Sequence, residues 1–193
     1  MLNIWNTSKK ILKNGGVIIA PTDTLYGILS RAEDKKAVDR IYKIKGRDEG
    51  KPFIILITSV KDLDKFNIKH SEILSNTRML PKVSMIMPCG NKKWEYLHRG
   101  TKSLAFRLIS PKNKYLYALI KRVGPLVAPS ANPQGLEPAY TIKEAKNYFG
   151  DNIDLYINSG TRKSKPSTIV SFMESKPKII RQGIVKLPAN YFK

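Results

Sequence analysis

The stretch KAVDRIYKIKGRDEGKPFIILI, residues 36–57, decides the fold. Residues 35–45 carry apolar side chains at helical spacing, and Gly46 follows as a helix stop signal. FIILI at 53–57 is a short, continuous apolar run of the kind that forms a buried strand. The stretch therefore predicts a helix, a polar loop and a buried strand, which is the repeating pattern of an α/β fold.

The loop between these two elements, GRDEGK at 46–51, has the outline of a phosphate loop. A Walker A loop needs a four-residue spacer and a Ser or Thr after its lysine, whereas this spacer is one residue short and Pro52 follows Lys51. A phosphate loop also opens a helix, and this loop follows a helix C-terminus, where the dipole disfavours anions. Any anion bound here must be held by side chains such as Lys45, Arg47 and Lys51.

The rest of the chain alternates strands with helices. Further strands are expected at 17–20, 83–88, 103–109, 126–128, 155–158, 167–172 and 178–183. Further helices are expected at 4–12, 60–66, 71–79, 113–123 and 141–149, the last opened by a capping box. No repeat period or linker interrupts the pattern, so we expect a single α/β domain with a twisted, open, mixed sheet and flanking helices.

Composition narrows the partners. At 193 residues and 41% apolar content, the chain can bury one core. Its 35 Lys and Arg against 15 Asp and Glu give a net charge of +20, which attracts nucleotides, RNA or anionic membranes, or else belongs to a solvated surface. A lone cysteine, Cys89, excludes an internal disulfide, and no apolar run approaches the roughly 18 residues of a membrane span. We expect a cytoplasmic protein without a signal peptide or membrane contact.

Three polar clusters follow predicted strands or helices: APTDTLYG at 20–27, KGRDEGK at 45–51 and VAPSANPQG at 127–135. Strand ends are where open α/β sheets bind ligands. The first cluster offers alternating hydroxyls and is also compatible with an ordinary turn. In the third, two prolines stiffen the turn that presents Ser130 and Asn132. Opposite the cations Lys45 and Arg47, this pair could grip a triphosphate.

Two arginines stand inside or beside apolar strands, Arg107 in SLAFRLI and Arg181 in IIRQG. A guanidinium in such a position needs a carboxylate, a phosphate or exposure to water. Serine–histidine–acid catalysis has little support, since neither His70 nor His98 lies near a nucleophile elbow, and both are expected on the surface.

Taken in order, the segments PTDTLYG, KGRDEGKPF, SLAFR, PSAN, PSTIV and IIRQG make the chain resemble the YrdC-like family of threonylcarbamoyl-AMP synthases, over about residues 15–184. The resemblance implies a sheet curved around a basic concave cavity that takes ATP, L-threonine and bicarbonate. It also implies the short, single-domain form over residues 1–193, without the second C-terminal domain of longer members. The implied product is L-threonylcarbamoyladenylate, with release of pyrophosphate, for threonylcarbamoyladenosine modification of tRNA.

The resemblance also implies the roles of ten residues. The Lys-x-Arg and Ser-x-Asn tetrad, implied to be catalytic, consists of Lys45, Arg47, Ser130 and Asn132. The implied ATP contacts are Arg47, Lys51, Ser103, Ser130, Asn132 and Arg181. The implied L-threonine contacts are Thr24, Arg107 and Ser167. Mg²⁺ is expected to arrive with ATP, and no side-chain metal site or organic cofactor is expected.

Two segments depart from the family pattern. MLPKVSM at 79–85 replaces a Trp-Pro-Gly-Pro segment and keeps only Ser84 as a hydroxyl, and Pro138 stands where a serine is common. The implied partners include tRNA or double-stranded RNA and proteins that transfer the threonylcarbamoyl group. Two alternatives stay open: an RNA-binding module whose nucleotide site has decayed, and an accessory domain of hydrogenase maturation.

Overall fold

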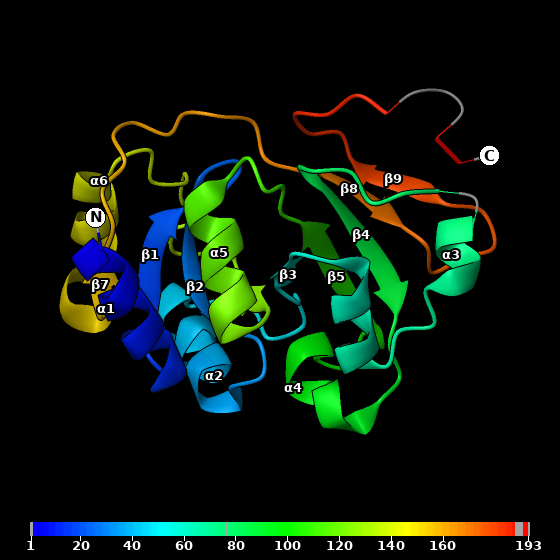
Figure 1. Cartoon of the computed structure of the whole chain (residues 1–193), viewed down its shortest axis with the longest axis horizontal. Helices are drawn as coiled ribbons and strands as arrows, with labels where there is room; N and C mark the ends of the chain where they lie inside the picture. Colours follow the sequence, from blue (N-terminus) through cyan, green and yellow to red (C-terminus); the bar gives the residue numbers. More distant parts are fainter. Residues whose placement is uncertain (1, 76, 188–190, 193) are drawn as a thin grey trace.

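One mixed sheet organises the computed structural model, which describes residues 2–75, 77–187 and 191–192 (Figure 1). The strands of the described part are β1 (Ile18–Pro21), β2 (Tyr26–Arg31), β3 (Ile54–Ile57), β4 (Val83–Pro88), β5 (Ser103–Leu108), β6 (Leu126–Val127), β7 (Leu155–Tyr156), β8 (Thr168–Ser171) and β9 (Lys178–Arg181). Their order is β7-β1-β2-β6-β3-β5-β4-β8-β9. The sheet contains parallel pairs, such as β3 with β5, and antiparallel pairs, such as β4 with β5, which confirms the predicted mixed sheet.

Helices pack on both faces of the sheet. They are α1 (Leu2–Lys13), α2 (Lys35–Lys45), α3 (Ser71–Ser75), α4 (Glu95–His98), α5 (Lys114–Val123) and α6 (Ile142–Phe149), with short 3₁₀ segments η1 (Val60–Phe66), η2 (Lys92–Trp94) and η3 (Gly150–Asn152). Apolar side chains of α1 and α5 join one core layer, and those of α2, η1, α4 and α6 join the other. Figure 1 shows α1 and α5 side by side over the half of the sheet that contains β1 and β2.

The sequence predicted most of these elements, with three differences. Strand β2 was not predicted from the sequence, because its short apolar run directly follows the polar PTDT turn. The helix expected at 71–79 has only the five residues of α3. His98, expected on the surface, is 5% exposed, because the unanticipated helix α4 turns its last residue inward, where His98 Nδ1 accepts a hydrogen bond from the backbone N–H of Gly100.

The ends of helix α2 fix the loop that follows it. Asp34 caps its first turn by accepting a hydrogen bond from the N–H of Ala37, 3.0 Å. Gly46 ends the helix in the left-handed conformation at φ 55°, which glycine adopts without strain. Its backbone N–H bonds back to the last turn, so the chain leaves the helix abruptly. The loop of residues 46–52 therefore starts from a fixed point at the helix C-terminus, as the sequence predicted.

A row of facing residues crosses five adjacent strands. Leu56 lies opposite Arg107, Arg107 opposite Ser84, Ser84 opposite Ile169, and Ile169 opposite Arg181. Facing residues in a sheet project to the same side, so the two arginines share one face with Leu56. Leu56 belongs to the core layer covered by α1 and α5. Beyond Leu56 the row turns polar, and this part of the face becomes the floor of a cavity.

The connection from β7 to β8, residues 157–167, crosses along the top of the sheet in Figure 1. It is tied at its start by Tyr26, whose hydroxyl donates to the carbonyl of Gly160 at 2.8 Å and accepts from the N–H of Ser159 at 2.8 Å. At its end it passes directly against the backbone of Gly183. A Cβ on Gly183 would lie 2.3 Å from the carbonyl oxygen of Pro166, closer than any real contact.

This close approach predicts that Gly183→Ala destabilises the fold. The added methyl group must push β9 away from the 157–167 connection, and overpacking of this kind costs about 1–3 kcal/mol. We expect a lower urea midpoint for Gly183→Ala. The matched control is Gly90→Ala, because a Cβ on Gly90 meets nothing within 4 Å. Equal midpoints for the two variants would contradict the packing argument.

Candidate functional site

A cavity of about 500 Å³ lies on the uncovered half of the sheet face. Its floor is the polar end of the cross-strand row, and its walls come from the β1–β2 turn, the loop after α2, the turn after β6 and the 157–167 connection. Seven of the ten predicted site residues line it: Thr24, Arg47, Ser103, Arg107, Ser130, Ser167 and Arg181. Lys45, Lys51 and Asn132 do not line it. The fold thus brings residues 157 positions apart into one cavity, whose lining holds three guanidinium groups and one carboxylate, that of Glu137.

Arg107 is a buried cation with a buried partner. Its Nη2 lies 3.0 Å from Oδ1 of Asp23, and the two side chains are 5% and 8% exposed. Burial lowers the pKa of Arg107, and the Asp23 carboxylate opposes that shift. The sequence predicted that this arginine needs a carboxylate, a phosphate or exposure to water, and its partner in the structure is the carboxylate of Asp23. Because Asp23 belongs to the β1–β2 turn, the ion pair also locks that turn against β5.

Arg181 reaches the same floor from the edge strand β9. Its Nε and Nη2 donate to the backbone carbonyl of Ser167 at 3.1 and 3.0 Å, and Nη2 also contacts the Ser167 hydroxyl at 3.3 Å. Burial and, to a smaller degree, the nearby charge of Arg107 lower the pKa of Arg181. No carboxylate pairs with Arg181 in the described part of the chain. Two guanidinium groups with one buried carboxylate leave a net positive charge at the floor, which favours an anionic ligand.

Lys45 points away from the cavity and into the protein. Its Nζ donates to the backbone carbonyl of Ser130 at 2.6 Å and to that of Asn132, and the residue is 2% exposed. A backbone hydrogen bond also joins the C-terminus of α2 to the turn after β6, since the N–H of Gln134 donates to the carbonyl of Lys45 at 2.9 Å. Lys45 therefore holds the Ser-x-Asn turn in place against the C-terminus of α2. Burial, aided by the charge of Arg47, lowers the pKa of Lys45 to about 7.

Asn132 also serves the turn. Its Oδ1 accepts from the Ser130 hydroxyl at 2.6 Å, and its Nδ2 donates to the carbonyls of Pro133 and Leu136 at 3.0 and 2.7 Å. These hydrogen bonds occupy both polar atoms of the Asn132 side chain and close a compact loop. Ser130, in contrast, lines the cavity. The predicted tetrad thus divides into two residues that face the cavity, Arg47 and Ser130, and two that hold them in position.

Arg47 enters the cavity from the loop after α2. Its Nε donates to the backbone carbonyl of Lys51 at 3.0 Å, and its guanidinium lies over the ring of Phe53, 5.3 Å from the centroid. Neither Nη atom has a partner among the described residues, so both are available to a ligand. Lys51 is exposed and its Nζ lies 3.5 Å from the carboxylate of Asp48. A flexible lysine at the mouth can still swing toward a bound anion, but the structure does not place it there.

Paired hydroxyls line the threonine side of the predicted site. Thr22 and Thr24 have their hydroxyl oxygens 3.3 Å apart, and Ser84 and Ser167 have theirs 3.0 Å apart. Ser84 is fully buried in the cross-strand row. It is the hydroxyl that remains in the divergent 79–85 segment, and it holds Ser167, which faces the cavity. Of these four residues, Thr22, Thr24 and Ser167 line the cavity and can offer hydroxyls to a small polar ligand.

Sequence reasoning missed several residues that shape the cavity. Asp23, in the turn between β1 and β2, was not among the predicted site residues, although its carboxylate is the counter-charge for Arg107. Pro138 lines the cavity at the position of the departure noted above, next to Glu137 and Tyr140. No sequence signal indicated Tyr140, because its place depends on a distant residue: its backbone carbonyl accepts a hydrogen bond from the N–H of Arg162 at 2.7 Å.

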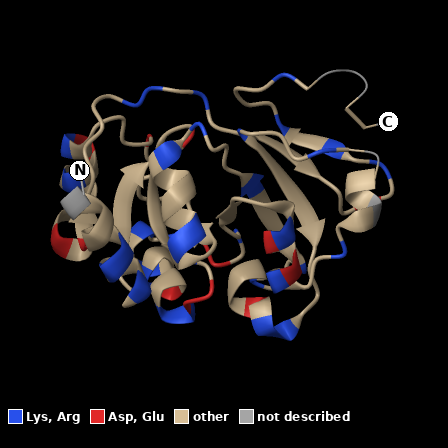
Figure 2. Cartoon of the chain, viewed as in Figure 1, with Lys and Arg blue, Asp and Glu red and all other residues tan. Residues whose placement is uncertain are grey.

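The charge of the whole chain does not single out this cavity. Lys and Arg residues are distributed along most of the helices and several loops rather than gathered on one element (Figure 2). Within the described residues, no group of three or more His, Cys, Asp or Glu side chains is placed to hold a metal ion. None of the described helices has the length and apolar character needed to cross a bilayer.

Comparison with known protein families and sequences points to one family. The family model for Sua5, YciO and YrdC, described as telomere recombination, matches residues 10–183. Uncharacterized protein YciO of Escherichia coli is 26% identical over 195 residues, which cover 93% of this chain and 88% of YciO. The putative threonylcarbamoyl-AMP synthase of Methanocaldococcus jannaschii is 31% identical over 183 residues, which cover 93% of this chain and 85% of that protein.

A solved structure agrees with the fold. Sua5 of Pyrococcus abyssi, in its complex with L-threonine, superposes with a TM-score of 0.82 at 26% identity, over 93% of this chain and 54% of the Pyrococcus chain. The threonylcarbamoyl-AMP synthase sequence of the same organism is 30% identical over 89% of this chain and 52% of its own length. The present chain thus spans about half the length of that relative.

The buried ion pair predicts a strongly asymmetric response to mutation. Asp23→Leu leaves Arg107 buried without a counter-charge, and we expect a loss of about 3–5 kcal/mol in the free energy of unfolding. Asp23→Leu/Arg107→Met replaces both charges by apolar groups and should recover most of that loss. Urea unfolding of the two variants and the wild type measures the difference. A double variant no more stable than Asp23→Leu would contradict the pairing.

The buried lysine predicts a pH dependence of stability. The folded state releases the Lys45 proton near pH 7, whereas the unfolded chain keeps it up to about pH 10.5, its ordinary pKa. Between these values the unfolded state binds more protons, so stability rises with pH. Relative to Lys45→Met, the wild type should gain about 2 kcal/mol between pH 7 and 9, since each pH unit contributes up to about 1.4 kcal/mol.

Urea unfolding of wild type and Lys45→Met at each pH measures this difference. The subtraction removes the titration of the other basic groups. A difference that stays flat, or falls, from pH 7 to 9 would show that the lysine keeps its proton in the fold.

Proposed function

Because the chain belongs to the Sua5, YciO and YrdC family, we propose that it is an L-threonylcarbamoyladenylate synthase, a nucleotidyltransferase that uses ATP, L-threonine and bicarbonate. The observation that carries the proposal is the single cavity into which Arg47, Arg107 and Arg181 converge. Three guanidinium groups, against the carboxylate of Glu137 and the buried carboxylate of Asp23, leave an excess of positive charge that suits anionic ligands, namely a triphosphate, an amino-acid carboxylate and bicarbonate. The naming of relatives as threonylcarbamoyl-AMP synthases supports the same reading.

We propose that L-threonine lies on the floor of the cavity. Its carboxylate would bind Arg107, whose orientation is already fixed by Asp23. The hydroxyls of Thr24 and Ser167 line the same cavity and would bind the remaining polar atoms of threonine. The Sua5 structure of Pyrococcus abyssi was solved with L-threonine, which supports this choice of amino acid.

We propose that ATP lies toward the loop after α2. The unpartnered Nη atoms of Arg47 form a planar fork that matches phosphate oxygens, and Ser130 and Ser103 offer hydroxyls on either side. Arg181 would neutralise charge from the opposite edge. Lys51 would move from Asp48 to the phosphates at the mouth of the cavity. Mg²⁺ would enter with ATP, because Mg²⁺ is commonly held through substrate phosphates and the described residues offer no carboxylate cluster for it.

In the proposed reaction, the neutral threonine amine forms a C–N bond with bicarbonate and releases water, or with CO₂ and releases a proton to solvent, to give an N-carboxylate. An oxygen of that carboxylate then attacks the α-phosphorus of ATP, and the bond to the β-phosphate oxygen breaks to release pyrophosphate. The protein's part is to align the substrates and to stabilise the negative charge that develops on the phosphates. Preorganised cations and hydroxyls meet this demand, so the reaction needs no histidine or pair of carboxylates in the cavity.

Within this proposal, the four residues of the tetrad have unequal roles. Arg47 and Ser130 would contact ATP, whereas Lys45 and Asn132 would act as positioning residues through the turn that they hold. The product would serve threonylcarbamoyladenosine modification of tRNA. The further partners we propose are tRNA or double-stranded RNA and proteins that transfer the threonylcarbamoyl group.

The experiment is a pyrophosphate-release assay on the purified protein. With Mg–ATP, bicarbonate and L-threonine, we expect release that stops when threonine or bicarbonate is omitted. Arg47→Ala should lower kcat/KM by about 100-fold, a loss typical of removing one positioned charge in an active site. Lys121→Ala is the matched control, because this exposed cation lies on α5 outside the cavity, and its rate should equal that of the wild type.

Two outcomes would overturn the proposal. Pyrophosphate release that ignores threonine would mean that the cavity serves another reaction of ATP. No release, together with salt-dependent tRNA binding, would favour an RNA-binding module whose nucleotide site has decayed.

A further inference from the structure

We propose that Arg99, which lies outside the nucleotide cavity, is a positioning residue that orients Arg47 through a column of stacked side chains. The column runs Arg99, Tyr42, Phe53, Arg47, with a cation at each end and two aromatic rings between. The inference rests on the proposed function in so far as Arg47 is taken to bind ATP. It names Arg99, Tyr42 and Phe53 as supports of that contact.

The column is continuous. The Arg99 guanidinium lies over the ring of Tyr42, 4.1 Å from its centroid. The rings of Tyr42 and Phe53 stack with centroids 4.1 Å apart and planes 23° apart. The Arg47 guanidinium lies over the other end of the stack, 5.3 Å from the Phe53 centroid. Each step is an attractive contact, and both rings are buried at 3% exposure, where such contacts are strongest.

A hydrogen-bond junction reinforces the column beside the rings. The backbone carbonyl of Lys51 accepts from the Tyr42 hydroxyl at 3.1 Å and from Arg47 Nε at 3.0 Å. The N–H of Arg47 also donates to the carbonyl of Tyr42, 3.1 Å. Movement of the Tyr42 ring therefore displaces both the stacking surface and the acceptor that set the direction of the Arg47 guanidinium.

Arg99 is held firmly at the far end. Its Nη2 pairs with Asp39 of α2, and its Nη1 lies 3.4 Å from Glu49 in the loop of residues 46–52. Its backbone adopts the left-handed conformation at φ 48°, uncommon for a residue with a side chain and frequent where geometry matters to function. The Arg99 side chain is 13% exposed. A residue fixed by two carboxylates and an unusual backbone is a stable base for the column.

The loop of residues 46–52 separates two cavities. Arg47 and Pro52 line the nucleotide cavity, whereas Glu49 and Gly50 line a second hollow of about 790 Å³ together with Arg99. Arg99 is absent from the lining of the first cavity. Because Arg99 does not line the nucleotide cavity, we attribute an effect of Arg99 that depends on Arg47 to the loop and the stacked rings, whereas an effect of its charge through space would not depend on Arg47.

The test is a double-mutant cycle on Mg–ATP affinity, measured by calorimetry on the full chain. Arg99→Met keeps an unbranched apolar stem of similar volume to the aliphatic part of arginine and removes the charge and the planar face. We expect it to weaken Mg–ATP binding by about five-fold, the scale of one cation–π contact. In the Arg47→Ala background, Arg99→Met should have no further effect, because the group that it positions is gone. Additive losses in the two backgrounds would overturn the inference.

A second readout does not depend on ATP. In the wild type, the Nε–H of Arg47 is hydrogen-bonded, so its NMR signal should exchange slowly with solvent. Arg99→Met should accelerate that exchange about five-fold or more, and an unchanged rate would overturn the inference. If the wild type binds no ATP, the proposed function fails, and this signal still decides whether Arg99 positions Arg47.

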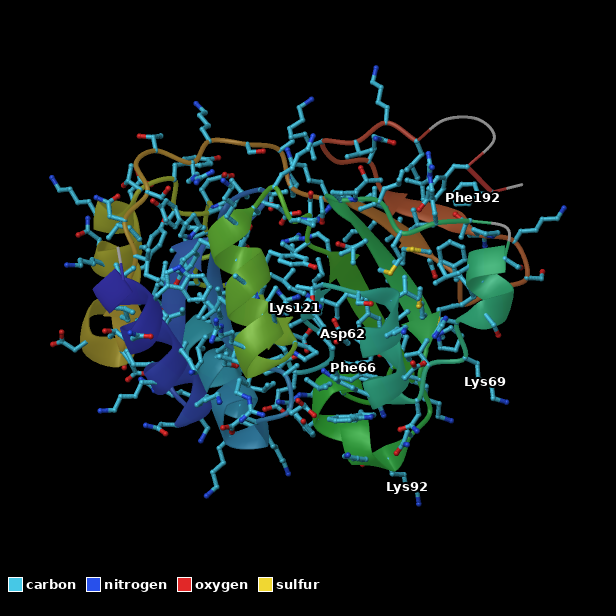
Figure 3. The ribbon with its side chains drawn as sticks, in the orientation of Figure 1. Asp62, Phe66, Lys69, Lys92, Lys121 and Phe192 are labelled. Atoms are coloured by element: carbon cyan, nitrogen blue, oxygen red, sulfur yellow. The ribbon has the colours of Figure 1, made fainter. Side chains whose placement is uncertain are left out.

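Two further variants separate a specific effect of Arg99 from a general effect of mutation or a loss of folding. Lys92→Met is the matched control, since Lys92 lines the same second hollow, points away from the protein at its lower edge in Figure 3, and has no place in the column. It should leave both readouts unchanged. Arg99→Lys keeps the charge facing Asp39 and Glu49 but not the planar face. We expect it to give intermediate values at wild-type stability, and it decides the question if Arg99→Met unfolds.

Discussion

A guanidinium in the middle of an apolar sheet can stay there only if a counter-charge is brought to it, and the ion pair between Arg107 and Asp23 meets that requirement. The carboxylate comes from the turn after β1, on the other side of β6 and β3 from Arg107. The pair therefore fixes the wall of the cavity to its floor. It also neutralises one of two adjacent cations, so that the floor keeps a single excess positive charge instead of two mutually repelling ones.

Around this pair, the structure separates residues that face the cavity from residues that hold them. Lys45 and Asn132 bind backbone groups of the turn after β6, and Ser84 binds Ser167 from below. Each holding residue makes its hydrogen bonds within the protein, and each facing residue keeps polar atoms for a ligand. A reaction that is accelerated by alignment and charge stabilisation depends on such supporting residues, because a small displacement of a binding group greatly lowers the reaction rate.

The sequence predicted the parts of the molecule whose signals are local. Apolar runs gave β3, β4 and β5, and helical spacing with a glycine stop gave α2 and α5. The order of six short motifs predicted the family, and seven of the ten residues that it indicated line the cavity. The direction of a side chain was not predicted: Lys45, the last residue of α2, and Arg47, in the loop after it, lie only two positions apart, yet Lys45 is buried away from solvent and Arg47 lines the cavity. That difference arises from the carbonyls of Ser130 and Asn132, more than 80 residues away, and periodicity carries no information on such contacts. For the same reason, the role of Asp23 was missed and the expectation that His98 lies on the surface was wrong.

The order of strands in the sheet has a consequence for how the protein comes into being. The floor of the cavity needs β8 and β9, which are made from residues 168–181, to dock beside β4 of residues 83–88. During synthesis, the first 160 residues can form most of the sheet, yet they leave the edge of β4 unpaired until β8 and β9 emerge from the ribosome. Pairings between distant parts of a chain are slow because a long loop must close first. The arginines of the cavity floor are therefore assembled late in folding, so a nascent chain can be compact well before it can bind its ligands.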